Sequence, residues 1–130
     1  MSDENNPDDW FVLAQNRLQI ADDSYSIRGA TLGCVELLHE AVERYLKGWL
    51  IAHEWPLQRT HNLRVLMEEA EQRDTSFEQF LDFADELTQK FFAQHYPGSD
   101  LEDVLTDYDV LREQATALIT LIQEGSDDTV

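Results

Sequence analysis

The chain has 130 residues, of which 42% are hydrophobic and 28% are charged. This length and composition predict one globular domain that spans residues 1–130. The 27 acidic and nine basic side chains give a net charge of −18, which excludes the broad basic surface that DNA binding requires. The single cysteine, Cys34, excludes an intramolecular disulfide and a four-cysteine zinc site.

The ends of the chain carry no targeting signal that we recognise. No apolar run approaches the length of a membrane span, and residues 1–9 are acidic and lack the apolar core of a signal peptide. We therefore expect a cytoplasmic protein without membrane association. Residues 1–7 and 124–130 are acidic and are expected to be flexible tails.

The first two predicted helices are both long. Proline at the first turn, two following aspartates and apolar residues at three-and-four spacing predict a helix over about residues 7–27, ended by Gly29. A second helix is expected over about 31–53. Its apolar arc is wide, so it is predicted to be mostly buried, and Glu43 and Lys47 lie on the narrow polar stripe opposite.

Three further helices follow the break at Trp55-Pro56. Helical spacing predicts a short helix over about 62–73, a long one over about 75–94 and a last one over about 101–123. No stretch alternates as a strand does. The predicted fold is therefore all-α, an up-and-down bundle of four main helices plus one short helix.

Charge is distributed unevenly along the chain. Residues 44–73 carry five bases and four acids, whereas 74–109 carry ten acids and Lys90 alone among bases. An anion site must therefore be local, and the first region is its expected host. Arg59, His61 and Arg64, beside a helix start, are candidate contacts for a phosphate or nucleotide. Alternatively, His61 makes a hydrogen bond that fixes its loop to the bundle.

The sequence offers no metal or cofactor signature. The histidines at 39, 53, 61 and 95 form no His-x3-His pair, and Glu36 with His39 is a single copy of a pair that di-iron bundles repeat. A glycine-rich phosphate loop is also missing. We expect neither a metal site nor a cofactor, and Cys34 on the apolar side is expected in the core.

Several segments together resemble the HEPN family of small helical proteins. They are the stretch 34–51, Thr60-His61-Asn62-Leu63 and the Tyr96-Pro97 turn. The matching positions, within a helical region of roughly 10–123, are Cys34, Ala41, Glu43, Leu46, Lys47, Leu50, Thr60, His61, Leu63, Tyr96 and Pro97.

The resemblance implies a homodimer of HEPN-like bundles with a role near nucleotides or RNA. Some members are metal-independent RNases and toxins whose site is an Arg a few residues before a His, at the dimer cleft. Others pair with a minimal nucleotidyltransferase, and others only bind. On this view Glu43 and Lys47 line the dimer cleft; otherwise they form a solvent-exposed pair on one helix. Tyr96, in the matching turn, is a further candidate binding residue.

Three functions follow from this pattern. Because no Arg stands at the RNase spacing before any His, we expect a non-catalytic nucleotide- or RNA-linked binding module that partners a minimal nucleotidyltransferase in a toxin–antitoxin-like pair. The alternative is a divergent metal-independent RNase, with His95 as general base and Lys90 holding the phosphate. The third is a structural or adaptor homodimer without a ligand.

Overall fold

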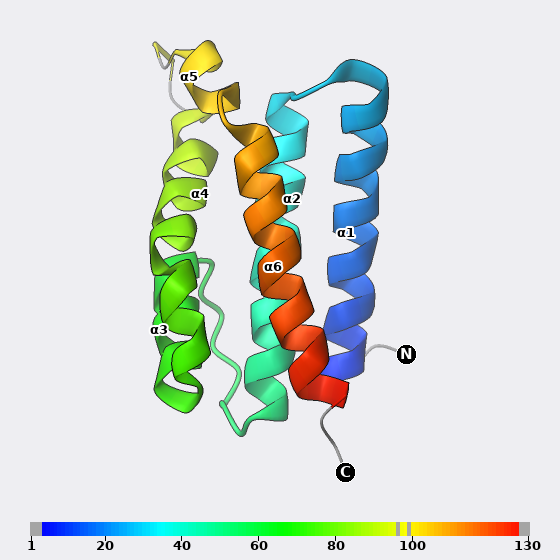
Figure 1. Cartoon of the computed structure of the whole chain (residues 1–130), viewed down its shortest axis with the longest axis vertical. Coiled ribbons are helices and arrows are strands. Elements are labelled where there is room, and N and C mark those ends of the chain that lie inside the picture. Colours follow the sequence, from blue (N-terminus) through cyan, green and yellow to red (C-terminus); the bar gives the residue numbers. More distant parts are fainter. Residues whose placement is uncertain (1–3, 96, 99, 128–130) are drawn as a thin grey trace.

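The molecule is a bundle of helices joined by short connections (Figure 1). The computed structural model describes residues 4–95, 97–98 and 100–127, and these residues form no strand. None of the described helices has the length and apolar character that a membrane span requires. The elements are α1 (Pro7–Arg28), α2 (Leu32–Ala52), α3 (Leu63–Arg73), the 3-10 helix η1 (Thr75–Phe80), α4 (Leu81–Ala93), α5 (Leu101–Leu105) and α6 (Tyr108–Asp127). The predicted all-α bundle is confirmed, with α1, α2, α4 and α6 as its main helices.

Helix α2 is the centre of the bundle. It packs against α1 on one side, against α3 and α4 on the other, and against α6 in front (Figure 1). Thirteen of its residues are buried, and the side chains of Leu38, Leu46 and Leu50 are among the largest fully buried ones. The wide apolar arc of the sequence therefore indicated the right environment for this helix.

Helix α1 is held mainly by α2 and buries only Ala14 and Ala21 completely. Its other apolar side chains are more exposed than the three-and-four spacing predicts: Leu13 and Tyr25 are 39% and 37% exposed. The two helices approach closely at Gly48 of α2, where a Cβ atom would lie 2.6 Å from the ring of Phe11. Small residues at this contact bring the backbones together.

The predicted fourth and last helices differ from the observed ones. The segment expected as one helix over 75–94 begins as η1, capped by the Asp74 carboxylate, before α4 starts. The segment over 101–123 is divided into α5 and α6 at Asp107, whose φ is +67°. The Lys90 ammonium holds this break, because it donates to the backbone carbonyls of Asp103 (2.8 Å) and Thr106 (3.0 Å).

The two acidic ends were expected to be tails. At the N-terminal end, Asn6 caps α1 by accepting from the amide of Asp8, and the backbone oxygen of Glu4 accepts from the indole of Trp10. At the C-terminal end, α6 continues to Asp127. Residues 1–3 and 128–130 lie outside the described residues.

Candidate functional site

A buried ion pair lies on the central helix. Glu43 and Lys47 are four residues apart on α2, and their charged groups are 3.0 Å apart. Their side chains are only 6% and 5% exposed, so the solvent-exposed pair considered from the sequence does not form. Charges this deeply buried persist when each is matched by a partner of opposite sign and by further hydrogen bonds.

The second partner of Glu43 comes from the loop before α3. His61 places its Nδ1 atom 3.1 Å from both carboxylate oxygens of Glu43. The loop is fixed on both sides of this contact: Trp55 is buried in the core, and the Asn62 side chain caps α3 through the amides of Arg64 and Val65. The loop-fixing hydrogen bond expected of His61 therefore exists. Its ring is nevertheless 80% exposed, and remains accessible to a ligand.

The first turn of α1 covers the other side of the ion pair. The Lys47 ammonium lies 5.5 Å from the centre of the Trp10 ring, which is the geometry of a cation–π contact. The close approach at Gly48 brings the two helices near enough for this contact, since Phe11 and Trp10 are neighbours in α1. A buried ammonium thus has both a carboxylate and an aromatic face.

These residues surround a pocket of about 230 Å³, which we call the α2–loop pocket. Its walls are Glu43, Arg44 and Lys47 of α2, Glu4 and Trp10 at the start of α1, and residues 57–59 and 61 of the loop. Three of these side chains are basic and two are acidic, and His61 adds a titratable ring. The lining therefore has one more basic than acidic side chain, in a chain whose net charge is −18.

Two arginines at the pocket make ion pairs that are at least partly exposed. Arg59 lies 3.2 Å from the Glu4 carboxylate, and its side chain is 83% exposed. Arg44 lies 4.0 Å from Glu40 and is 20% exposed. Pairs that solvent reaches contribute little stability, so both guanidinium groups can change partners at small energetic cost.

Histidine 39 precedes Glu43 by one turn of α2 and is also buried. The residue is 2% exposed, and its ring stacks on Phe91 of α4 with 4.1 Å between centres. Burial lowers the pKa of His39 from near 6.5 to about 4, although Glu43 acts in the opposite direction. Its Nε2 atom has no hydrogen-bond partner. The imidazole is thus neutral at pH 7.

A family model for the HEPN domain matches residues 8–124. The chain belongs to the HEPN domain family. Comparison with the curated proteins and with the solved structures gives no match. Membership assigns the chain to a family of nucleotide- or RNA-related modules, and HEPN domains often dimerise.

The HEPN fold brings together four of the predicted site residues, Glu43, Lys47, Arg59 and His61. Arg64 is directed elsewhere, to Glu68 (2.8 Å) and to Asp85 of α4 (2.6 Å). These carboxylates raise the pKa of its guanidinium, with the Glu68 hydrogen bond as the largest cause. Arg64 is therefore engaged between α3 and α4.

The residues considered for an RNase site of the HEPN type lie at the end of α4. Lys90 donates to the two carbonyls at the α5–α6 break, and the pocket it lines does not include His95. The His95 ring is exposed and contacts the edge of Phe91, at 5.1 Å between centres. Tyr96 lies outside the described residues.

Five lining residues of the α2–loop pocket are not among the binding residues predicted from the sequence: Glu4, Trp10, Arg44, Leu57 and Gln58. The sequence predicts Trp10 only as part of the apolar face of its helix, because no sequence pattern indicates its contact with Lys47. Among the residues that the structure describes, no group of three His, Cys, Asp or Glu side chains is arranged to hold a metal ion.

Proposed function

We propose that this HEPN protein is a non-catalytic module that binds a nucleotide, or a nucleotide unit of RNA, in the α2–loop pocket. One observation carries the proposal: a slightly cationic pocket lies over the buried Glu43–Lys47 pair in an otherwise strongly acidic chain. Arg59, Arg44 and His61 supply donors for phosphate oxygens. The half-buried Trp10 supplies an aromatic surface for a base.

The buried pair prepares the pocket rather than contacting the phosphate first. Lys47 is already neutralised by Glu43, so the charges free to attract a ligand are those on the rim. Glu43 orients the His61 ring through Nδ1 and leaves Nε2 directed away from the carboxylate. Nε2 is therefore the ring nitrogen left for contact with a ligand.

A thermal shift assay with the full chain tests this function. ATP is expected to raise the melting temperature, because a ligand that binds only the folded state at one hundred times its dissociation constant stabilises it by about 2.7 kcal/mol. Arg59→Gln should lose most of the shift. Arg28→Gln, which removes the same charge at the far end of α1, should keep it.

The outcomes separate binding from the ligand-free adaptor considered above. No shift with ATP, with other nucleoside triphosphates or with short RNA would favour the adaptor and refute the nucleotide site. Equal losses in Arg59→Gln and Arg28→Gln would show that net charge, and not the pocket, attracts the ligand.

The non-catalytic part of the proposal rests on Lys90. Its ammonium is engaged by two backbone carbonyls, and the surrounding segment 74–109 is acidic, which disfavours an RNA phosphate there. We expect no RNA cleavage in excess chelator beyond the background of His95→Ala. Cleavage by the wild-type protein that disappears in His95→Ala would establish the RNase alternative instead.

We further propose a homodimer that uses the outer face of α1. Val12, Ile20 and Ile27 are 65%, 45% and 81% exposed, and their spacing of eight and seven residues places them on one stripe. Light scattering should give twice the 15.1 kDa of one chain. Ile20→Glu should restore the monomer mass, whereas Val65→Glu, at a site 40% exposed on α3, should not; a monomeric wild-type protein refutes the dimer.

The minimal nucleotidyltransferase partner remains a proposal from the family. The net charge of −18 suits a basic protein partner, because complementary charge accelerates association. Co-purification of the chain with such an enzyme, at low and at high salt, tests it.

A further inference from the structure

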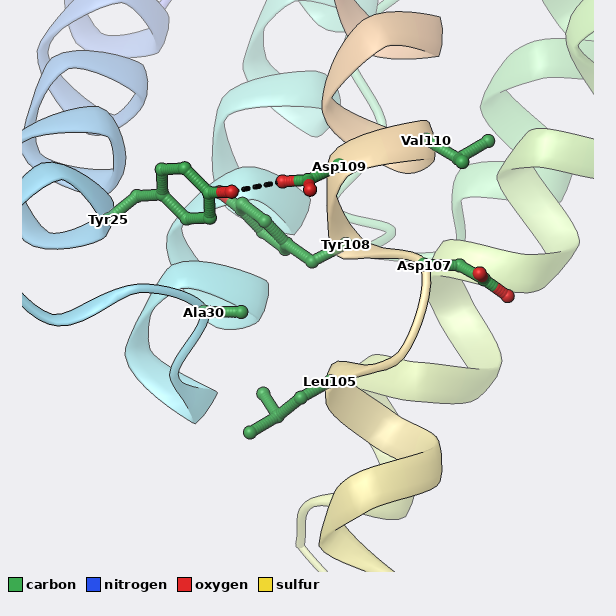
Figure 2. Close-up of a pocket in the computed structure, with 7 residues that line it drawn as sticks. All are labelled: Tyr25, Ala30, Leu105, Asp107, Tyr108, Asp109 and Val110. Carbon is green, nitrogen blue, oxygen red and sulfur yellow. Dashed lines mark hydrogen bonds between the residues drawn. The ribbon is translucent and has the colours of Figure 1, made fainter.

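A second pocket lies at the opposite end of α1 from the α2–loop pocket (Figure 2). It has a volume of about 280 Å³ and lies where the end of α1 meets the α5–α6 break. Its walls are Tyr25, Ala30, Leu105 and residues 107–110. We call it the Tyr25–Tyr108 pocket. None of the residues that line it is basic.

Two tyrosines form its aromatic wall. The rings of Tyr25 and Tyr108 stack with 5.4 Å between their centres and 27° between their planes. The Tyr25 hydroxyl donates to the Asp109 carboxylate, as Figure 2 shows. This hydrogen bond is the main cause that raises the pKa of Tyr25, so the phenol stays protonated and continues to donate.

Tyr108 leaves a polar atom without a partner. The residue is 2% exposed, and its hydroxyl has no hydrogen-bond partner. Figure 2 shows its ring extending from α6 toward the hydrogen bond between Tyr25 and Asp109. Buried hydroxyls are normally satisfied, so a donor bound at this end of the pocket would supply what is missing.

The polar groups of this pocket are mainly acceptors. Asp109 accepts from the Tyr25 hydroxyl, whereas the Asp107 carboxylate points away from the two rings (Figure 2). Asp107 has a φ of +67°, which divides α5 from α6 and places both carboxylates at the same break. A guanidinium group carries five donors and no acceptor, pairs with carboxylates and stacks on tyrosine rings. Its chemistry is the complement of this pocket.

We propose that the Tyr25–Tyr108 pocket binds an alkylguanidinium group, as carried by an arginine side chain of a basic protein or by a free guanidino compound. The alkyl chain contacts Ala30 and Leu105, and the flat head lies over Tyr25 against the Asp109 carboxylate. This site is distinct from the nucleotide pocket, which has different walls and the opposite preference in charge.

An NMR titration of the full chain with butylguanidinium tests the proposal. The amide signals of Ala30 and of residues 107–110 should shift in a saturable manner, whereas the neutral isostere butylurea should leave them unchanged. Asp109→Asn should weaken binding about tenfold, because it removes a charge-assisted hydrogen bond. Asp82→Asn, an exposed acid on α4, makes the same change in net charge and should weaken it less than twofold.

A second variant, at the break between α5 and α6, controls for local disruption of the pocket. Asp107→Asn keeps the backbone conformation, since asparagine adopts a positive φ readily, and should weaken binding by a smaller factor than Asp109→Asn, because its carboxylate points away from the two rings. If all three variants weaken binding equally, or if signals shift evenly over all acidic residues, the chain merely attracts cations and the proposal is wrong. Shifts with butylurea as large as with butylguanidinium would also overturn it.

The source of the guanidinium group is distinguished by two further probes. A glycine-flanked arginine peptide that binds more tightly than butylguanidinium indicates a protein side chain, because the flanking backbone adds contacts. Equal affinities indicate a free guanidino compound. Either result supports the site, and failure of both probes to shift the pocket signals refutes it.

Discussion

The two ends of α1 lie in opposite charge environments. At its start, Trp10 covers a Glu43–Lys47 pair that is almost entirely buried, under a rim with excess positive charge. At its end, Tyr25 bonds to an exposed aspartate in a pocket with two carboxylates and no base. Burial makes the first end costly to disturb, whereas solvent screens the second. Whether each pocket favours anions or cations therefore depends on how the charged side chains are arranged around it. The net charge of −18 does not predict this preference.

Breaking the buried pair should have the largest effect. Lys47→Met leaves the Glu43 carboxylate buried without its cation, and is expected to lower the free energy of unfolding by about 3 kcal/mol at pH 7. Glu43→Gln added to that variant should recover part of the loss. Urea denaturation measures both.

The matched control is an exposed arginine. Arg64→Met removes contacts to Asp85 and Glu68, in which the arginine side chain is 39% exposed, and should cost less than about 1 kcal/mol. Equal losses in Lys47→Met and Arg64→Met would contradict the energetic distinction between buried and exposed charge.

The next-largest loss of stability is expected at the close contact between α1 and α2. Gly48→Ala places a methyl group against the Phe11 ring, with a 2.6 Å approach before any movement. We expect a loss of about 2 kcal/mol from overpacking, despite the better helix propensity of alanine. Gly33→Ala at the other end of α2 meets only the Thr31 hydroxyl at 3.7 Å and should be neutral or slightly stabilising. Thermal unfolding of the two variants measures the difference.

Acid pH should destabilise the fold through His39, which lies on α2 between the two pockets. The unfolded chain protonates this histidine near pH 6.5, whereas the folded chain does so only near pH 4. Stability present at pH 7 is thus lost as the pH falls through this window, by about 2 kcal/mol between pH 7 and pH 5.

The corresponding measurement is urea denaturation at both pH values. His39→Leu should reduce the pH-dependent loss by that amount. His95→Gln, at an exposed position, should leave it nearly unchanged. A wild-type slope retained in His39→Leu would show that the acid sensitivity does not come from His39.

The smallest effect is expected at the acidic end. Arg112 of α6 donates twice to Asp22 of α1, at 2.8 Å each, and this bond is the largest cause that raises the pKa of Arg112. Arg112→Met should cost about 1 kcal/mol, since the pair is partly exposed. Arg17→Met, whose contact with Glu40 is 3.6 Å, should cost less. Identical melting temperatures for the two variants would show that the link between α1 and α6 contributes no measurable stability.

Most of the fold could be predicted because it depends on local periodicity. The bounds of α2 and α3 follow from their apolar spacing and from caps that the sequence displays, Thr31 and Asn62. The break at Asp107 could not be predicted, since neither glycine nor proline marks it. It depends on Lys90, which reaches carbonyl groups at Asp103 and Thr106 that come close only in the folded chain.

Part of the candidate site could also be predicted from local sequence. The basic segment 44–73 was the expected host of an anion site, and it contains His61 and the pocket's basic residues. The contact of Trp10 with Lys47 joins residues 37 positions apart, which no local pattern records. Arg64 follows His61 closely in sequence, yet α3 directs it to Asp85 on α4. Sequence proximity thus grouped residues that helix orientation separates.

Helix α1 forms a wall of both pockets, with Trp10 at one end and Tyr25 at the other, and it has few buried anchors of its own. Detachment of this one helix would therefore dismantle both pockets in a single event. A ligand at either end holds α1 in place for the other, which is positive thermodynamic coupling without any change of shape. Hydrogen exchange of the α1 amides should accordingly slow further with each ligand added, and the two should bind more tightly together than apart.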